Sequence, residues 1–246
     1  MRATAICPVC FYETHGLAGS RPKEVLGELD NNGHIHVRCE KGHYGIAVYD
    51  ARRYQVLIQS AAKAYVDGYT NEVIAVMGTA LERAYEFYVR VSCRAKGITL
   101  ENVEAAWKGV AMQSERQFGA FQFLHLVDHG EPFVIDDSIA KTRNRVVHRG
   151  QIATEREAVE CAEKVFSRIR AIESEIQARF ATDAAAEVAD EVKAQLDLVP
   201  EGTQALTVST HAVEVDESKH EVIAAIRSFM DLAIAEIQDR ERGAPY

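Results

Sequence analysis

Apolar residues recur at steps of three and four through the middle of the chain. The clearest run is Val73, Ile74, Met77, Ala80, Leu81, Ala84, Tyr88 and Val91. This spacing places the apolar residues on one face of a helix. The charged residues between them are predicted to face solvent: Glu82, Arg83, Glu86 and Arg90. A preceding helix at about 52–67 and an aromatic-rich stretch from Trp107 to Leu124 supply further core, so the pattern predicts an antiparallel helical bundle.

Two later helices carry their own start and stop signals. Asp136-Asp137-Ser138 offers N-cap chemistry after Pro132, and Gly150 is expected to end this short helix after His148. Thr154-Glu155-Arg156-Glu157 has the form of a capping box that opens a longer helix. The inward face predicted for that helix is Ala158, Cys161, Ala162, Val165, Phe166, Ile169, Ile172 and Ile176.

Residues 1–50 have a different pattern, which favours strands. Val25–Leu29 and His34–Val37 are predicted to pair as a hairpin, because Asp30-Asn31-Asn32-Gly33 between them is turn chemistry. The tail is mixed. Residues 181–195 are Ala-rich and predict a continued or restarted helix, 200–202 a turn, 205–215 one or two strands, and 218–240 a final amphipathic helix.

Two short chelating pairs flank the predicted hairpin, namely Cys7 with Cys10 and Cys39 with His43. Three thiolates and one imidazole form a closed tetrahedral site for Zn²⁺, with no position left for water. We therefore expect one structural zinc ion per chain, which replaces the core that about 45 residues cannot build alone. The segment from about residue 5 to 50 resembles zinc ribbons. His34 and His36 compete as ligands but are ranked below His43, and His15 is weaker still.

Composition restricts the class of protein. A net charge of −9 argues against an architectural nucleic-acid binder, because non-specific phosphate binding needs excess Lys and Arg, so any RNA contact must be local. Five cysteines, three of them in zinc-like spacing, fit a reducing compartment. Neither a secretory h-region nor an apolar run of about 18 residues is present, so we expect a cytoplasmic protein without membrane contact.

One short segment of this acidic chain is strongly basic. Between residues 141 and 149 it holds no acid but contains Lys141, Arg143, Arg145, His148 and Arg149. Asn144 and His148 share a helix face, whereas Arg143 lies about 140° round the helix from His148. A single helix cannot easily aim both at one phosphate. Two copies meeting across a two-fold axis could, so we expect a homodimer.

The run Arg143-Asn144-Arg145-Val146-Val147-His148 resembles the signature of HEPN domains, and the resemblance covers about residues 52–180. It implies a metal-independent endoribonuclease that leaves 2′,3′-cyclic phosphate ends, in a toxin or phage-defence role with an antitoxin or defence-system partner. Arg143 would stabilise the phosphate, Asn144 would orient it or the histidine, and His148 would act as acid or base. Lys141, Arg145 and Arg149 would contact RNA, and no catalytic metal is expected.

Other interpretations stay open. In the simplest, Arg143 is a surface cation, Asn144 and His148 pack at a helix C-terminus, and Gly150 is only a C-cap. A non-catalytic module that binds RNA or nucleotide, or an interaction protein, is the alternative function. The chain is thus predicted to be mainly α, with a zinc ribbon over 1–50, a HEPN-like bundle over 52–180 and a C-terminal extension over 181–246.

Overall fold

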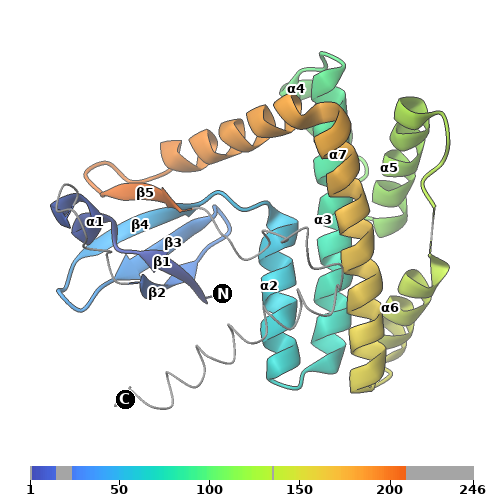
Figure 1. Cartoon of the computed structure of the whole chain (residues 1–246), viewed down its shortest axis with the longest axis horizontal. Helices are drawn as coiled ribbons and strands as arrows, with labels where there is room; N and C mark the ends of the chain where they lie inside the picture. Colours follow the sequence, from blue (N-terminus) through green and yellow to red (C-terminus); the bar gives the residue numbers. More distant parts are fainter. Residues whose placement is uncertain (1, 15–23, 135, 209–246) are drawn as a thin grey trace. The chain divides into compact units, whose positions relative to one another are not determined.

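The computed structural model describes residues 2–14, 24–134 and 136–208. These residues are mainly helical, with a small N-terminal β region, as the sequence predicts (Figure 1). Their contacts divide them into two compact units. The described part of one unit lies within Met1–Arg52 and Ala185–His211, and that of the other lies within Arg53–Ala184. None of the described helices is both long and apolar enough to cross a membrane.

The first unit is built on a five-stranded sheet in the order β1 (Arg2–Ile6), β2 (Glu24–Leu29), β3 (His34–Arg38), β4 (Tyr44–Tyr49) and β5 (Ala205–Val208). The first four strands pair antiparallel, and the predicted hairpin is confirmed by the pairing of Leu29 with Ile35. β5 pairs parallel with β4, with Ala205 opposite Ile46. Buried side chains of β3 and β4 form the core of this sheet: Ile35, Val37, Ile46 and Val48.

The described residues of the tail do not form the separate C-terminal extension that was predicted over residues 181–246. Because β5 is a strand of the N-terminal sheet, the described residues from Ala185 onward belong to the first unit. The predicted turn at 200–202 is present, since Thr203 N donates to Pro200 O at 3.1 Å. The final helix predicted at 218–240 and the strand residues after Val208 lie outside the described residues.

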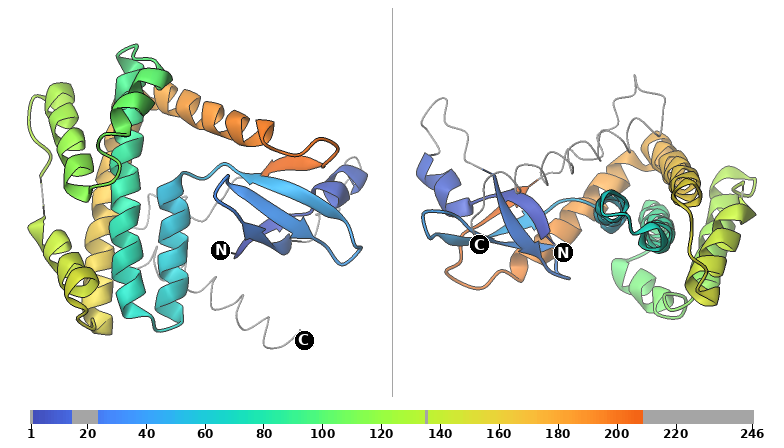
Figure 2. Two further views of the ribbon diagram at one scale, coloured as in Figure 1. Left: turned by 180° about the vertical axis from the view of Figure 1, so that it is seen from behind. Right: turned by 90° about the horizontal axis from the view of Figure 1, so that it is seen from below.

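The second unit contains α2 (Arg53–Val66), α3 (Thr70–Ala95), α4 (Leu100–Trp107), α5 (Ser114–His129), α6 (Asp137–Arg149) and the first part of α7 (Glu155–Asp197). α3 is the central helix and packs against α2, α4, α5 and α6, as the end-on view in Figure 2 shows. Its predicted apolar face is buried throughout. α7 is interrupted at Phe180 (φ −132°, ψ 24°), so the Ala-rich stretch restarts a helix.

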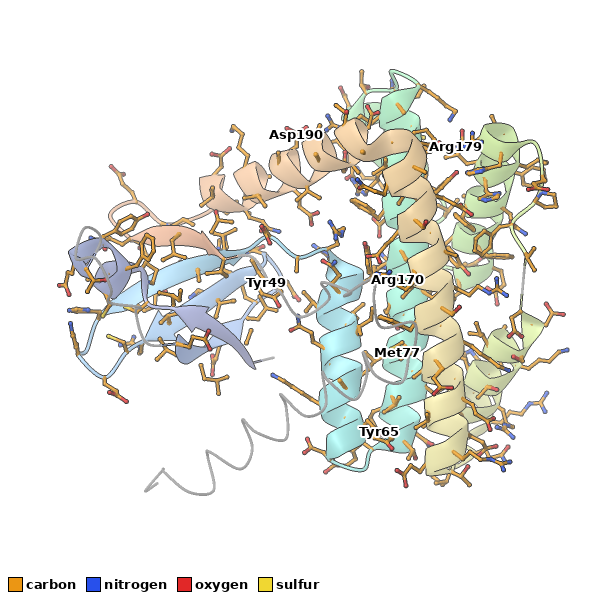
Figure 3. All side chains as sticks on the ribbon, in the orientation of Figure 1. Tyr49, Tyr65, Met77, Arg170, Arg179 and Asp190 are labelled. Carbon is orange, nitrogen blue, oxygen red and sulfur yellow. The ribbon has the colours of Figure 1, made fainter. Side chains whose placement is uncertain are left out.

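Local signals set the ends of α6 and α7 as predicted. The Asp136 carboxylate accepts from Ser138 N at 2.9 Å and caps α6, which ends at Gly150 in the left-handed region. Thr154 and Glu157 make the reciprocal bonds of a capping box, with Thr154 N donating to Glu157 Oε2 at 2.8 Å and Glu157 N donating to Thr154 Oγ1 at 3.3 Å. The start of α7 is also tied to the C-terminal end of α2, where the Tyr65 hydroxyl donates to Glu155 Oε1 at 2.6 Å. Tyr65 is labelled in Figure 3.

Candidate functional site

The four predicted metal ligands lie at two turns of the first unit. Cys7 directly follows β1, and Pro8 then opens α1 (Pro8–Thr14), a helix that the sequence pattern does not predict. Cys10 lies in this helix. Cys39 and His43 flank the tight connection between β3 and β4, which Gly42 closes with its N–H donating to Cys39 O at 2.9 Å.

α1 can approach the sheet because residue 45 of β4 is glycine. A Cβ at Gly45 would lie 2.9 Å from Pro8 Cγ, closer than real contacts allow. The Tyr12 hydroxyl donates to Ala205 O at 2.9 Å and ties the same helix to β5. The sheet therefore holds the Cys7–Cys10 turn beside the Cys39–His43 turn.

The ligand atoms of Cys7, Cys10, Cys39 and His43 all lie within 4.8 Å of one another, so these residues could hold a metal ion. The Sγ atoms of Cys10 and Cys39 are 3.7 Å apart, and Cys10 Sγ lies 3.3 Å from His43 Nδ1. A tetrahedral ion with metal–sulfur distances of about 2.3 Å has a sulfur–sulfur edge of about 3.8 Å. The spacing thus fits such an ion.

The surroundings of these ligands also suit a cation. Burial, together with Cys39 and Cys7, raises the pKa of the Cys10 thiol to about 11, because a thiolate there would be desolvated and close to other sulfur atoms. A bound cation would reverse this effect and release the protons. The other ring nitrogen of His43 lies 3.7 Å from Glu13 Oε1, and a carboxylate there orients a metal-binding imidazole.

The competing histidines are engaged elsewhere. His34 is buried, and its Nε2 lies 2.8 Å from Gln195 O. His36 Nε2 lies 3.1 Å from Asp30 Oδ2, and Asp30 also accepts the backbone N–H groups of Asn32 and His34. Neither His34 nor His36 is in the cysteine cluster. His15 lies outside the described residues.

The basic segment forms α6, and its arginines have different surroundings. Arg143 Nη2 pairs with Glu82 Oε1 of α3 at 3.2 Å, and Glu82 also accepts from Ser114 Oγ. The prediction that Glu82 faces solvent is therefore wrong. Arg145 Nη2 donates to Glu157 Oε1 at 2.6 Å. The hydrogen bonds from Thr154 and Arg145 hold the pKa of Glu157 at about 2, so this acid stays charged.

Arg143 crosses α3 at a glycine. A Cβ on Gly78 would lie 2.9 Å from Arg143 Cδ and 3.1 Å from its Nε. Glycine inside a helix costs about 0.5–1 kcal/mol relative to alanine, so this position gives up helix stability to make room for the arginine. The buried Nε of Arg143 has no hydrogen-bond partner among the described residues.

Four further polar residues of the basic segment are exposed: Lys141, Asn144, His148 and Arg149. Asn144, Val147 and His148 follow the i, i+3, i+4 spacing, so they share one uncovered face of α6. The structure thus brings Asn144 and His148 to one face and sets Arg143 apart on the face that meets α3. This is the separation that the helical geometry predicts.

A cavity of about 280 Å³ lies beside Arg143 within the second unit. Its walls come from α3, α5, α6, α7 and the residues between α5 and α6, and include the aromatic rings of Tyr85, Phe118 and Phe133. Arg143 and Asn144 line it, whereas His148 is not among its lining residues. Burial raises the pKa of Tyr85, so its hydroxyl keeps its proton and can donate.

Comparisons with known proteins give no analogy for either feature. No protein-family model, curated protein or solved structure matches this chain. The functional assignment therefore rests on the residues and their geometry.

A third group of polar side chains was not anticipated from the sequence. His125 and His129 of α5 and Glu175 of α7 have ligand atoms within 4.8 Å of one another. The two imidazole rings are stacked, with centroids 4.1 Å apart and planes 9° apart. Two histidines four residues apart on one helix are the signal that could have found this group, but the sequence alone does not place Glu175 beside them.

Hydrogen bonds within the protein satisfy this group. His125 Nδ1 lies 3.0 Å from Glu131 O, and its Nε2 lies 3.0 Å from Glu175 Oε2. Both partners are acceptors, so each ring nitrogen of His125 has a hydrogen-bond partner within the protein. The Tyr88 hydroxyl donates to Asp128 Oδ2 at 2.9 Å and can accept from His129 Nε2, which lies 3.1 Å away.

Asp128 joins this network to the end of α3. Burial acts to raise its pKa, but hydrogen bonds from Lys96, Ser92 and Tyr88 outweigh burial and hold the pKa below the usual value. Arg179, marked in Figure 3, donates to the Asp128 carbonyl at 2.5 Å. Burial, and then His125, lowers the pKa of His129, because a second positive charge beside the first ring is disfavoured.

Proposed function

We propose that the chain is a metal-independent endoribonuclease of the HEPN type that acts as a homodimer through α6. The observation that carries this proposal is the placement of Arg143 and His148 on different faces of one helix, with Asn144, Val147 and His148 uncovered. Val147 is 44% exposed on this face. A second copy seated there would bury Val147 and bring His148 of one protomer near Arg143 of the other.

The chemistry of strand scission fits these residue types. A base removes the proton of the 2′-OH, the 2′-oxygen forms a bond to phosphorus, the bond to the 5′-oxygen breaks, and an acid protonates that leaving oxygen. Histidine can serve as the base or the acid near neutral pH. Arginine donates to the non-bridging oxygens as negative charge builds up on them. The products are a 2′,3′-cyclic phosphate and a 5′-hydroxyl.

Glu82 is a positioning residue in this proposal. It fixes the Arg143 guanidinium at 3.2 Å and is itself held by Ser114 Oγ. A phosphate would have to share or replace this carboxylate, so binding is expected to be modest in the ground state. Arg143 pairs with Glu82 and Arg145 pairs with Glu157, so Lys141 and Arg149 are the exposed cations of α6 that would attract RNA.

We also propose that the cluster of Cys7, Cys10, Cys39 and His43 binds Zn²⁺ in a structural role. Three sulfur ligands and an imidazole in tetrahedral spacing favour this ion, and four protein ligands leave no coordination position for substrate. The cytoplasmic location remains a prediction from the sequence, and the toxin or phage-defence role and the antitoxin or defence-system partner remain predictions from the resemblance.

The test is cleavage of a mixed RNA substrate in magnesium-free buffer by full-length, zinc-loaded protein. His148→Ala is expected to lower the rate by about 10²–10⁴-fold, the usual contribution of a general acid or base. Arg156→Ala is the matched control, because Arg156 is 86% exposed on α7. It should leave the rate unchanged. Product ends are identified by mass spectrometry.

Mixing two inactive variants tests the composite site. Arg143→Ala combined with His148→Ala is expected to restore about a quarter of the wild-type rate, because random exchange makes half of the dimers mixed, each with one intact site of two. No recovery in a mixture shown to contain mixed dimers would contradict a site shared between protomers.

A non-catalytic module that binds RNA through the same helix is the second candidate. The neutralisation of Arg143 by Glu82 favours it, because a catalytic arginine must be available to the phosphate. Binding without cleavage by a zinc-loaded dimer would select this candidate over the ribonuclease.

A further inference from the structure

The cavity beside Arg143 has the features of a ligand site and is not used by the scission chemistry. Its volume of about 280 Å³ is at the small end of ligand pockets, so it suits a single small ring system. Phe118, Phe133 and Tyr85 give it flat apolar walls. Arg168 lies over the Phe133 ring at 5.8 Å and closes the α7 side. Aromatic walls of this kind stack nucleic-acid bases without regard to their sequence.

The charge of the lining argues against a phosphate group as the occupant. The cavity is lined by two arginines, Arg143 and Arg168, and by four carboxylates, Glu82, Glu115, Asp136 and Asp137. Excess negative charge repels a phosphate but attracts a neutral ring that presents N–H donors. Asp136 is already used as the cap of α6, and Glu82 holds Arg143.

Two of the carboxylates are available to a ligand. Glu115 and Asp137 are exposed and line the cavity, and their carboxylates make no ion pair or hydrogen bond to any residue within the described ranges. A carboxylate has two acceptor oxygens side by side and pairs best with two adjacent donors. Among the RNA bases, only guanine presents two such donors on its Watson–Crick edge, the N1–H and the 2-amino group.

We propose that this cavity binds a guanine base of the RNA next to the cleaved phosphate, with its ring against the aromatic wall and its donor edge on Asp137 or Glu115. The inference rests on the proposed function, because it places the base beside the arginine that would contact the phosphate. A guanine site would give the protein a preference for one base beside the cleaved phosphate. The carboxylates that select this base, those of Asp137 and Glu115, lie outside the run from Arg143 to His148.

The experiment measures binding separately from cleavage. Five-residue RNAs with 2′-O-methyl groups throughout cannot be cut by 2′-oxygen attack, so fluorescence anisotropy reports affinity alone. The central base is guanine, hypoxanthine, adenine or cytosine, with uracil elsewhere. Full-length protein is expected to bind the guanine oligomer at least about five-fold more tightly than the hypoxanthine oligomer, because hypoxanthine lacks the 2-amino donor and leaves a carboxylate oxygen unpaired.

Variants assign the preference to the cavity. Ala140 lines the cavity and is exposed on α6, so Ala140→Leu fills the space without disturbing the core and should remove the preference. Ala105→Leu, at an exposed position of α4, is the matched control and should keep it. Asp137→Asn combined with Glu115→Gln should reduce the ratio of the affinities for the guanine and hypoxanthine oligomers toward one. Glu101→Gln, which neutralises an acid in the first turn of α4, should leave this ratio unchanged.

The outcomes separate this proposal from the proposed function. Guanine-selective binding that Ala140→Leu removes supports the cavity, even if natural RNA is not cut and the ribonuclease is wrong. Equal affinity for the four oligomers overturns the cavity proposal, even if RNA is cut. Guanine selectivity that survives Ala140→Leu also overturns it, because the base then binds elsewhere.

Discussion

Two of the three groups of metal-binding residue types found among the described residues lie in different compact units. Cys7, Cys10, Cys39 and His43 lie within the sheet unit, and His125, His129 and Glu175 lie within the helical unit. Each group has its ligand atoms within 4.8 Å of one another. By spacing alone the two are equivalent.

The two groups differ in whether their ligand atoms have hydrogen-bond partners within the protein. His125 has acceptors at both ring nitrogens, and His129 faces a tyrosine oxygen that can accept from it. In the cysteine cluster, Cys10 Sγ faces another sulfur and an imidazole nitrogen at 3.7 and 3.3 Å, and the pKa of the Cys10 thiol is raised by burial and by the neighbouring sulfur atoms. Proximity therefore does not identify a metal site. The hydrogen-bond partners of the ligand atoms do so better.

The largest expected effect follows removal of a sulfur ligand. Cys39→Ser should lose the bound zinc and unfold the Cys7–His43 end of the sheet unit, because a structural zinc contributes about 10–16 kcal/mol in small zinc-binding peptides. Zinc content by mass spectrometry and hydrogen exchange of β1–β4 are the measurements. Cys93→Ser, at a half-buried thiol outside the cluster, should retain its zinc. Full zinc occupancy in Cys39→Ser would contradict the assignment.

The histidine group should respond in stability and not in metal content. Glu175→Ala leaves the buried His125 without its carboxylate partner and should cost about 1–3 kcal/mol. Urea unfolding followed by Trp107 fluorescence reports on the same unit, since Trp107 is buried in α4. Glu160→Ala, at an acid that is 57% exposed, is the control and should change little. A second metal equivalent in wild type, lost in Glu175→Ala, would overturn the distinction.

A smaller effect is expected from pH. The folded protein holds the pKa of His129 below its usual value of 6.5, so the unfolded chain binds this proton more readily. The contribution of neutral His129 to stability is present above about pH 6.5 and is lost as the pH falls through the lower pKa of the folded state, with a slope of at most about 1.4 kcal/mol per pH unit. Urea midpoints between pH 7.5 and 5.5 should fall less steeply in His129→Gln. An unchanged slope would assign the dependence to other groups.

The smallest effect should come from Asp30, which lies with His34 and His36 in a third group of possible ligands. Its carboxylate accepts from Asn32 N at 2.8 Å and His34 N at 3.0 Å, so it acts as turn chemistry. Asp30→Ala is expected to cost about 1 kcal/mol, seen as faster hydrogen exchange at His34, with zinc content unchanged. Loss of zinc in this variant would mean that the groups are coupled.

The sequence predicts those parts of the fold whose signals are local. The capping residues Asp136 and Thr154, the C-cap Gly150 and the Asp30–Gly33 turn act within a few residues, and each lies where expected. The metal ligands belong to the same class, because each chelating pair is short in sequence and thiolate chemistry restricts its use. The face of α7 was predicted correctly because its burial follows the helical period.

Contacts between distant segments could not be predicted in this way. β5 reads as a short alternating segment, and nothing local indicates that Ala205 pairs with Ile46. Glu82 looks like a solvent-facing acid in the pattern of α3, yet it holds Arg143. Gly78 is informative only when the arginine that crosses it is known. These features depend on which helix faces meet, which periodicity does not encode.

The parallel pairing of β4 with β5 has a consequence for how the chain folds while it is being synthesised. The whole helical segment, Arg53–Ala184, is inserted between the two parts of the sheet unit. A nascent chain can therefore bring its cysteine and histidine ligands together early. One edge of β4 has no partner strand while the helices are translated. The sheet is completed only when Val208 has left the ribosome, so the ion would have to hold an unfinished sheet through most of translation.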